Sequence, residues 1–223
     1  MPCSICGQSG HNKKTCKQII TNEIPVIENH SDTDELSLDN YTVEILREMY
    51  LLHKNYVISR KQLALRLGIK FRLPSIPEDI SENIIKFIIH KCGDKSCSWD
   101  CKGDLISRSE GIQECKCFTS IGPISFTPSS DWDVIYFLDA RDWLNDRFIL
   151  YKVKLKRTSE MWKSIIINKT QTFNDQCNQK RRPRIGWIQL YPQIKSYCEQ
   201  IYSGTFDDIF TETKLESNDQ RLI

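Results

Sequence analysis

The sequence predicts an α/β (α+β) fold in which a mixed β-sheet is flanked by helices. Helical periodicity dominates residues 39–90, and strand-like apolar runs follow it over residues 103–155. A last helical pattern covers residues 190–202, LYPQIKSYCEQIY. Helices first, several strands next and a helix last are typical of a sheet whose faces are covered by helices.

The composition is that of a soluble globular protein. The chain has 223 residues, 39% of them hydrophobic and 27% charged, which allows one sizeable domain and a small appendage. No run of 18 apolar residues and no apolar leader occurs, so we expect neither a membrane span nor a signal peptide. Ten cysteines without a secreted framework indicate an intracellular, reducing compartment: the cytoplasm or, for a eukaryotic virus, the nucleus or a viral factory.

Two segments are predicted to form the helical part that precedes the strands. Asp39 or Asn40 is placed to cap a helix in TVEILREMYLLHK, and a second short helix is expected from Ser59 to Gly68. Such a pair is either a helix-turn-helix or, as we favour, a helical subdomain packed on the core. A further helix is expected over residues 76–90, with Asp79 or Ser81 as its cap and an apolar stripe of Ile80, Ile84, Phe87 and Ile88.

Four strands are predicted after this helix, in GDLIS, IQECKCF, WDVIYFLDA and RFILYKVKL. The first two are separated by SRSEG, which is long enough for a tight hairpin. One register closes a three-residue loop, residues 108–110, between Ser107 and Gly111. In that register Asp104 lies opposite Glu114, whereas a loop one residue longer would change the face.

The N-terminal residues 1–18 carry the spacing of a zinc site. Cys3, Cys6, His11 and Cys16 follow the pattern Cys-x2-Cys-x4-His-x4-Cys, which lets three thiolates and one imidazole converge on a tetrahedral Zn²⁺. So short a segment cannot bury a core, so Zn²⁺ would supply its folding free energy. The segment resembles a CCHC zinc knuckle, a module that usually binds single-stranded nucleic acid.

Charge divides the rest of the chain. Residues 23–39 hold six acids and no Lys or Arg, so residues 19–38 are predicted to be an acidic linker, and residues 39–223 the helical subdomain and the core. Residues 152–184 hold ten Lys or Arg and two acids, a balance of +8. Such a stretch is typical of a phosphate-binding surface, although it also fits a solvated face.

The predicted hairpin carries a combination of residues suited to phosphodiester hydrolysis. Glu114 and Lys116 share one face of a strand because they are two residues apart, and the hairpin adds Asp104. The carboxylates of Asp104 and Glu114 are hard ligands for Mg²⁺, and Lys116 can orient the attacking water. Glu82, on the preceding helix, is either a further ligand or a solvent-facing acid.

These residues resemble the motif of the PD-(D/E)xK nuclease superfamily, and among its members the type II restriction endonucleases. Gly103-Asp104 stands for the Pro-Asp of the family, and Glu114-Cys115-Lys116 for its (Asp/Glu)-x-Lys, within residues 77–184. The resemblance implies a restriction-endonuclease-like core with catalytic Asp104, Glu114 and Lys116, and Glu82 is the fourth predicted catalytic residue. It also implies Mg²⁺-dependent cleavage to 5′-phosphate ends, often by a homodimer with one site on each DNA strand.

A polar, basic stretch, NKTQTFNDQCNQKRRPRIGW, is the best candidate for a DNA-recognition loop. Amide side chains can read adenine edges, while Arg side chains can bind phosphates or guanines. A solvated loop is the alternative. The predicted nucleic-acid-binding residues are Lys169, Gln171, Asn174, Gln176, Arg181, Arg182 and Arg184.

Two other features have structural interpretations that we favour. Trp132 and Asp133 either shape a DNA cleft or belong to a packed loop. His90, Cys92, Cys97 and Cys101 either bind a second zinc or are a set of buried or partly exposed thiols, which we favour because the His-x-Cys interval is too short for a usual site.

The preferred interpretation is a sequence-specific, Mg²⁺-dependent endonuclease of double-stranded DNA with a structural Zn²⁺. A second hypothesis is a repair or recombination nuclease acting on branched or single-stranded DNA. A third is a zinc-knuckle nucleic-acid-binding protein without catalysis, against which the joint presence of Asp104, Glu114 and Lys116 argues.

Overall fold

A computed structural model describes residues 41–100 and 104–211 of the chain. The chain divides into two compact units, Met1–Leu36 and Ser37–Ile223, and all described residues belong to the second. The predicted zinc ligands Cys3, Cys6, His11 and Cys16, and the acidic linker, therefore lie outside the described residues. None of the described helices is long and apolar enough to cross a membrane.

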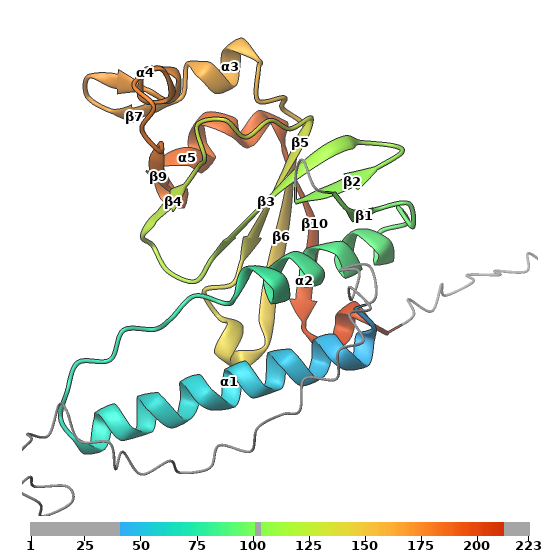
Figure 1. Ribbon diagram of the computed structural model, residues 1–223, viewed down its shortest axis with the longest axis vertical. Coiled ribbons are helices and arrows are strands. Elements are labelled where there is room, and N and C mark those ends of the chain that lie inside the picture. The colour runs from blue at the N-terminus through green and yellow to red at the C-terminus, as the bar shows by residue number, and fades with distance from the viewer. Residues whose placement is uncertain (1–40, 101–103, 212–223) are drawn as a thin grey trace, which may run out of the picture. The chain divides into compact units, whose positions relative to one another are not determined.

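The described chain forms five α-helices, three short 3-10 helices and ten strands (Figure 1). The α-helices are α1 (Val43–Arg66), α2 (Glu78–Lys91), α3 (Glu160–Lys163), α4 (Phe173–Asn178) and α5 (Trp187–Ile194). The 3-10 helices are η2 (Trp143–Asn145), η3 (Lys195–Tyr197) and η4 (Asp207–Ile209). The strands are β1 (Ser98–Trp99), β2 (Leu105–Ser107), β3 (Gly111–Phe118), β4 (Pro123–Ser125), β5 (Val134–Asp139), β6 (Arg147–Val153), β7 (Ile166–Asn168), β8 (Gln171–Thr172), β9 (Arg184–Gly186) and β10 (Cys198–Thr205).

Six strands form one mixed sheet in the order β1-β2-β3-β5-β6-β10. Strands β3 and β5 are parallel, and every other neighbouring pair in this sheet is antiparallel. The remaining strands form two small ribbons, β4–β9 and β7–β8. The predicted mixed sheet flanked by helices is confirmed, and all four predicted strands are present in it.

Both faces of the sheet are covered, each by its own hydrophobic core. Strand β5 is buried along its whole length, and its side chains alternate between the two cores. Val134, Tyr136 and Leu138 meet α1 and α2 in the first core. Ile135 and Phe137 meet aromatic residues of α3, α4 and α5 in the second. Figure 1 shows α2 crossing the sheet with α1 beneath it.

Helix α1 is one continuous helix of 24 residues, so the prediction of two helices joined by a loop is wrong. No Gly or Pro interrupts residues 53–59, and the buried Val57 and Ala64 continue the stripe of Leu46 and Tyr50 at helical spacing. The helix ends next to Gly68, as predicted, where φ is +62°.

The starts of α1 and α2 differ from the predicted caps. Thr42, not Asp39 or Asn40, caps α1, and its hydroxyl accepts a hydrogen bond from the amide of Ile45. Pro77 precedes α2 without a side-chain cap, and Asp79 and Ser81 lie inside the first turn. The predicted stripe of α2 is confirmed, with Ile80, Ile84 and Ile88 at most 3% exposed and Phe87 partly buried.

The predicted C-terminal helix over residues 190–202 is half wrong. Helix α5 stops at Ile194, and from Cys198 the chain becomes strand β10, which pairs with β6. The free edge of β6 offers backbone partners that local periodicity cannot reveal, so pairing across the fold overrides the helical pattern.

Candidate active site

The β2–β3 hairpin has the three-residue loop that the sequence allowed. Ser107 pairs with Gly111 and Leu105 pairs with Gln113, so the next step along the ladder places Asp104 opposite Glu114. Gly111 has φ +71°, a conformation that glycine adopts without steric cost, and a Cβ there would overlap the Asp133 carboxylate. The hairpin register is therefore confirmed, and Gly111 is the residue that permits it.

Successive side chains of strand β3 point to opposite faces of the sheet. Glu114 and Lys116 point to one face and form an ion pair, with 2.5 Å between Nζ and Oε1. Cys115 points to the opposite face, into the first core. The predicted division of this strand into two faces is confirmed.

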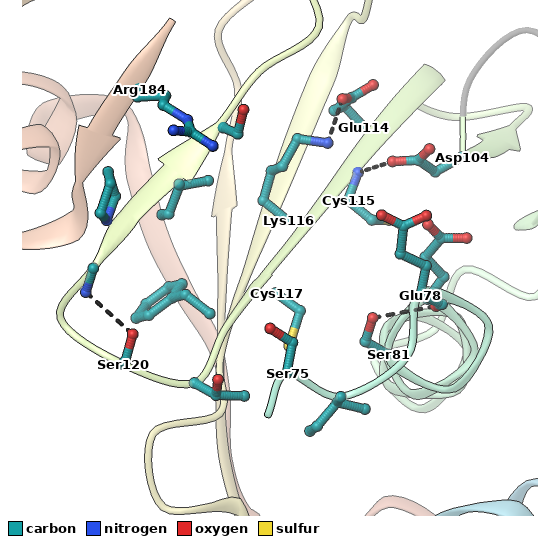
Figure 2. A pocket seen from close by; sticks show the side chains of 18 of the residues that line it. Ser75, Glu78, Ser81, Asp104, Glu114, Cys115, Lys116, Cys117, Ser120 and Arg184 are labelled. Carbon is teal, nitrogen blue, oxygen red and sulfur yellow. Dashed lines mark hydrogen bonds and ion pairs between the residues drawn. The ribbon is translucent and has the colours of Figure 1, made fainter. Parts of the chain in front are cut away.

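Asp104 is held by the backbone of the same strand. Its Oδ2 accepts a hydrogen bond of 2.6 Å from the amide of Cys115, as Figure 2 shows. One oxygen of this carboxylate is thus fixed by the strand that carries Glu114 and Lys116. The β2–β3 hairpin alone therefore sets the distance between the carboxylates of Asp104 and Glu114.

A cavity of about 630 Å³ brings these residues together with the start of α2. Glu78 and Glu82 enter it from α2, one helical turn apart, and Figure 2 shows Glu78 beside the hairpin acids. Arg184 of β9 lies at the other side of Lys116 in the same view. Hydroxyl groups complete the lining, contributed by Ser75, Ser81, Thr119, Ser120, Ser125, Thr127 and Ser130.

Crowded negative charge dominates the electrostatics of the cavity. Burial, together with the charges of Asp104 and Glu78, raises the pKa of Glu82 to about 8. Burial also raises the pKa values of Asp104 and Glu114, against the opposing effect of Lys116. Burial alone would lower the pKa of Lys116, but the adjacent Glu114 carboxylate outweighs it and raises that pKa. Of the four acids that line the cavity, three therefore have raised pKa values, and a bound cation would stabilise their ionised forms.

The donor set fits Mg²⁺ with few protein ligands. No three His, Cys, Asp or Glu side chains of the described residues are gathered as a closed metal site. Mg²⁺ retains several waters and usually takes one or two carboxylates, so the pair Asp104 and Glu114 suffices. Cys115 and Cys117 also line the cavity, and burial raises the pKa values of both thiols.

The predicted recognition loop is folded for most of its length. Residues 166–178 form the β7–β8 ribbon and α4, whose start has a capping box between Thr172 and Asp175. Gln176 is 6% exposed, and its amide donates to Gln171. The exposed members of the predicted set are Lys169, Arg181, Arg182 and Arg184, and Asn174 is half-buried.

Two further expectations resolve in favour of packing. Trp132 is 2% exposed, and its indole N–H donates to the carbonyl of Leu155. His90 Nε2 lies 2.7 Å from the carbonyl oxygen of Cys97, whose thiol donates to Gln113. Cys101 lies outside the described residues. Cys97 belongs to the first core, whereas Cys92 is exposed and its thiol donates to the carbonyl of Ile201.

Several residues that line the cavity were not predicted as site residues, among them Ser130, Glu78 and Arg72. Ser130 hydrogen-bonds Glu114 from the loop before β5. Glu78 precedes Glu82 by four residues, a spacing that places both on one helix face and could have revealed it. Arg72 reaches the cavity from the linker between α1 and α2, and no local pattern marks it.

Comparison with known protein families identifies the family of this chain. A family model described as Bsp6I restriction endonuclease matches residues 39–192, which include every residue of the β2–β3 hairpin and helix α2. The chain belongs to the Bsp6I restriction endonuclease family. The match extends from the predicted start of the helical subdomain through most of α5, and it ends before β10.

A curated member of this family provides a second comparison. The type II restriction enzyme Bsp6I of Bacillus sp. (strain RFL6) is 43% identical over 68 residues, which are 30% of this chain. The matched segment spans 36% of that enzyme's own length. No solved structure matches the chain.

Proposed function

We propose that the protein is a Mg²⁺-dependent, sequence-specific endonuclease that hydrolyses phosphodiester bonds of double-stranded DNA. The observation that carries this proposal is the convergence of Asp104, Glu114 and Lys116 on one hairpin, in a cavity of a chain of the Bsp6I family. This arrangement also supports the resemblance to the PD-(D/E)xK superfamily.

Each residue of the hairpin has a role that its geometry supports. Asp104 and Glu114 would hold Mg²⁺, which, when bound, polarises a phosphate oxygen and acidifies a water. Lys116 stays protonated, since its pKa is raised, so its ammonium orients the attacking water and offsets charge in the transition state. Glu82, across the cavity on α2, would add a ligand directly or through water.

The resemblance supplies the remaining features of the proposal. Cleavage would leave 5′-phosphate ends, and a homodimer would place one site on each strand. Exposed cations around Arg184 would neutralise phosphates, and Gln171 and Asn174 would offer amides to base edges. The N-terminal segment, with Cys3, Cys6, His11 and Cys16, would hold a structural Zn²⁺ and add nucleic-acid contacts.

Incubation of the purified protein with long duplex DNA tests the proposal. We expect discrete fragments with Mg²⁺ and none with EDTA. Lys116→Ala should retain DNA binding and abolish cleavage, because it removes the only ammonium that faces Glu114 in the described cavity. Fragment analysis on gels and a filter-binding assay give the two readouts.

Lys152→Ala is a matched control for this variant. This variant also removes a partly buried ion pair, in which Lys152 Nζ lies 2.6 Å from Glu110 Oε1. Neither residue of this pair lines the catalytic cavity. Equal loss of cleavage in both variants would point to unfolding rather than to chemistry. A metal-dependent smear instead of fragments would favour a repair or recombination nuclease, and binding without any cleavage would leave only a nucleic-acid-binding protein.

A further inference from the structure

A second basic stretch, separate from residues 152–184, covers the end of α1 and the linker that follows it. No Asp or Glu occurs between Glu48 and Glu78, whereas the same interval carries six Lys or Arg. Five of them fall within residues 60–72, and we call this group the basic arm: Arg60, Lys61, Arg66, Lys70 and Arg72. A long interval without any acid is unusual in a chain that is 27% charged.

The cations of the basic arm are exposed and lack acidic partners. All five side chains are exposed, and within residues 41–100 and 104–211 none of them forms an ion pair. Cations elsewhere are often neutralised, as Lys54 is by Asp146 and Lys152 by Glu110. The arm therefore presents positive charge that the described fold does not compensate.

The basic arm leads directly into the catalytic cavity. Figure 1 shows the chain between α1 and α2 as an extended segment that ends at the start of α2. Arg72 and Ser75 of this segment line the cavity together with Asp104 and Lys116. Arg184, from the other basic stretch, lines the same cavity. A phosphate chain that reaches Lys116 thus meets both basic stretches.

The arm is long enough to follow a DNA backbone. The six residue steps of helix from Arg60 to Arg66 rise about 9 Å. The six steps from Arg66 to Arg72 extend at most about 20 Å. Successive phosphates of one strand advance about 3.4 Å along the duplex axis. Cations spaced over this length can contact several phosphates beyond the one that is cut.

We propose that the basic arm is a phosphate-binding surface for the duplex that flanks the cleaved bond, with Arg72 as the contact nearest to the reaction. This inference rests on the proposed nuclease function and adds the side of the site on which the substrate runs. Its contacts are to the sugar-phosphate backbone, so they contribute affinity and a dependence on salt but no base specificity.

The salt dependence of DNA affinity tests whether the cations of the basic arm contact phosphates or are merely exposed to solvent. The arm variant is Arg60→Gln, Lys61→Gln, Arg66→Gln and Lys70→Gln, and Arg72→Ala is a separate variant. The control variant replaces four other exposed cations, which make no ion pair with a described acid, do not line the cavity and lie outside both basic stretches: Lys95→Gln, Arg108→Gln, Arg147→Gln and Lys195→Gln. The measurement is the affinity of full-length protein for duplex DNA in EDTA over a series of salt concentrations.

We expect the slope of log affinity against log salt to become shallower by about 0.9 for each phosphate that the arm variant no longer neutralises. If two phosphates are no longer neutralised, the slope should be shallower by about 1.8, whereas the control variant should keep the slope of the wild type. Arg72→Ala should make the slope shallower by about one such step and slow cleavage in Mg²⁺.

The outcomes distinguish this inference from the function on which it rests. Equal slopes for the arm variant and the wild type, with cleavage intact, would overturn the arm and leave the nuclease proposal standing. The same change of slope in the arm and control variants would assign the effect to net charge and also overturn the arm. Absence of both DNA binding and cleavage in the wild type would overturn the nuclease proposal itself.

Discussion

Glu82 makes the metal-free site sensitive to pH. Its pKa in the folded protein is about 8, against 4.5 for an ordinary glutamate, so the folded protein binds a proton that the unfolded chain releases between these values. The free energy of unfolding contributed by this residue is therefore highest below pH 4.5 and is lost as the pH rises toward 8. The raised pKa values of Asp104 and Glu114 act in the same direction.

Glu82→Gln tests this residue directly. In EDTA, we expect the wild type to lose stability between about pH 5 and about pH 8, and the variant to lose less, because a neutral amide replaces the titrating acid. Urea denaturation at both pH values gives the comparison. Asp175→Asn is a control, since Asp175 is an exposed acid whose pKa is lowered by the Thr172 backbone amide, which has the opposite effect. An identical pH dependence in wild type and Glu82→Gln would contradict the assigned protonation.

At the scale of single residues, the sequence predicted which side chains the hairpin brings together, but not the other residues that line the cavity. Asp104, Glu114 and Lys116 are close in the chain, so strand alternation and one turn length placed them together. Arg72 and Ser130 come from a linker and a loop whose paths depend on the whole fold. Nothing in their local sequence indicates which cavity they line.

Gly111 controls the geometry of the β2–β3 hairpin at the scale of elements. Gly111→Ala should destabilise the fold by about 1–3 kcal/mol, because its φ is unfavourable for alanine and the new Cβ meets the Asp133 carboxylate. It should also reduce cleavage, since the hairpin sets the position of Asp104 against Glu114. Urea denaturation and the cleavage assay provide the two measurements.

Comparison with Gly68→Ala separates the steric clash from the unfavourable φ in the loss of stability expected for Gly111→Ala. Gly68 also has a positive φ, +62°, but nothing lies within 4 Å of a Cβ built on it. A larger loss of stability in Gly111→Ala than in Gly68→Ala would measure the clash with Asp133. Equal losses would mean that Asp133 moves aside and that the hairpin does not depend on this contact.

Elements with strong local signals were predicted, and elements fixed by distant partners were not. Strands β2, β3, β5 and β6 were evident because each is a run of apolar and β-branched or aromatic residues bounded by turns. Strand β10 was predicted as helix, since its exposed residues carry no strand pattern and its structure depends on β6. The continuity of α1 was missed because a second helix was expected to begin at Ser59, a residue type that often caps a helix.

The two units of the chain yield one prediction for the whole molecule. If the segment with Cys3, Cys6, His11 and Cys16 binds zinc, the purified full-length protein should contain about one Zn²⁺ per chain. Cys3→Ser and Cys6→Ser together should remove that zinc, because a tetrahedral site cannot form from two ligands. Metal analysis by mass spectrometry is the measurement.

A pair of cysteines of the described unit serves as the control for zinc. Cys177→Ser and Cys198→Ser replace two free, half-buried thiols that belong to neither predicted zinc group. Loss of zinc in this control, or zinc retained after the change of Cys3 and Cys6, would count against the N-terminal site.

The hydrogen bond between Cys115 and Asp104 gives the molecule an internal reporter. The amide proton of Cys115 lies between the backbone of β3 and a carboxylate that titrates and that, in the proposed function, would bind Mg²⁺. The nitrogen chemical shift of this one amide should therefore follow the occupancy of the site, and its rate of hydrogen exchange should follow the opening of the hairpin. Both signals can be read by NMR in a sample that contains no DNA, before any bond is cut.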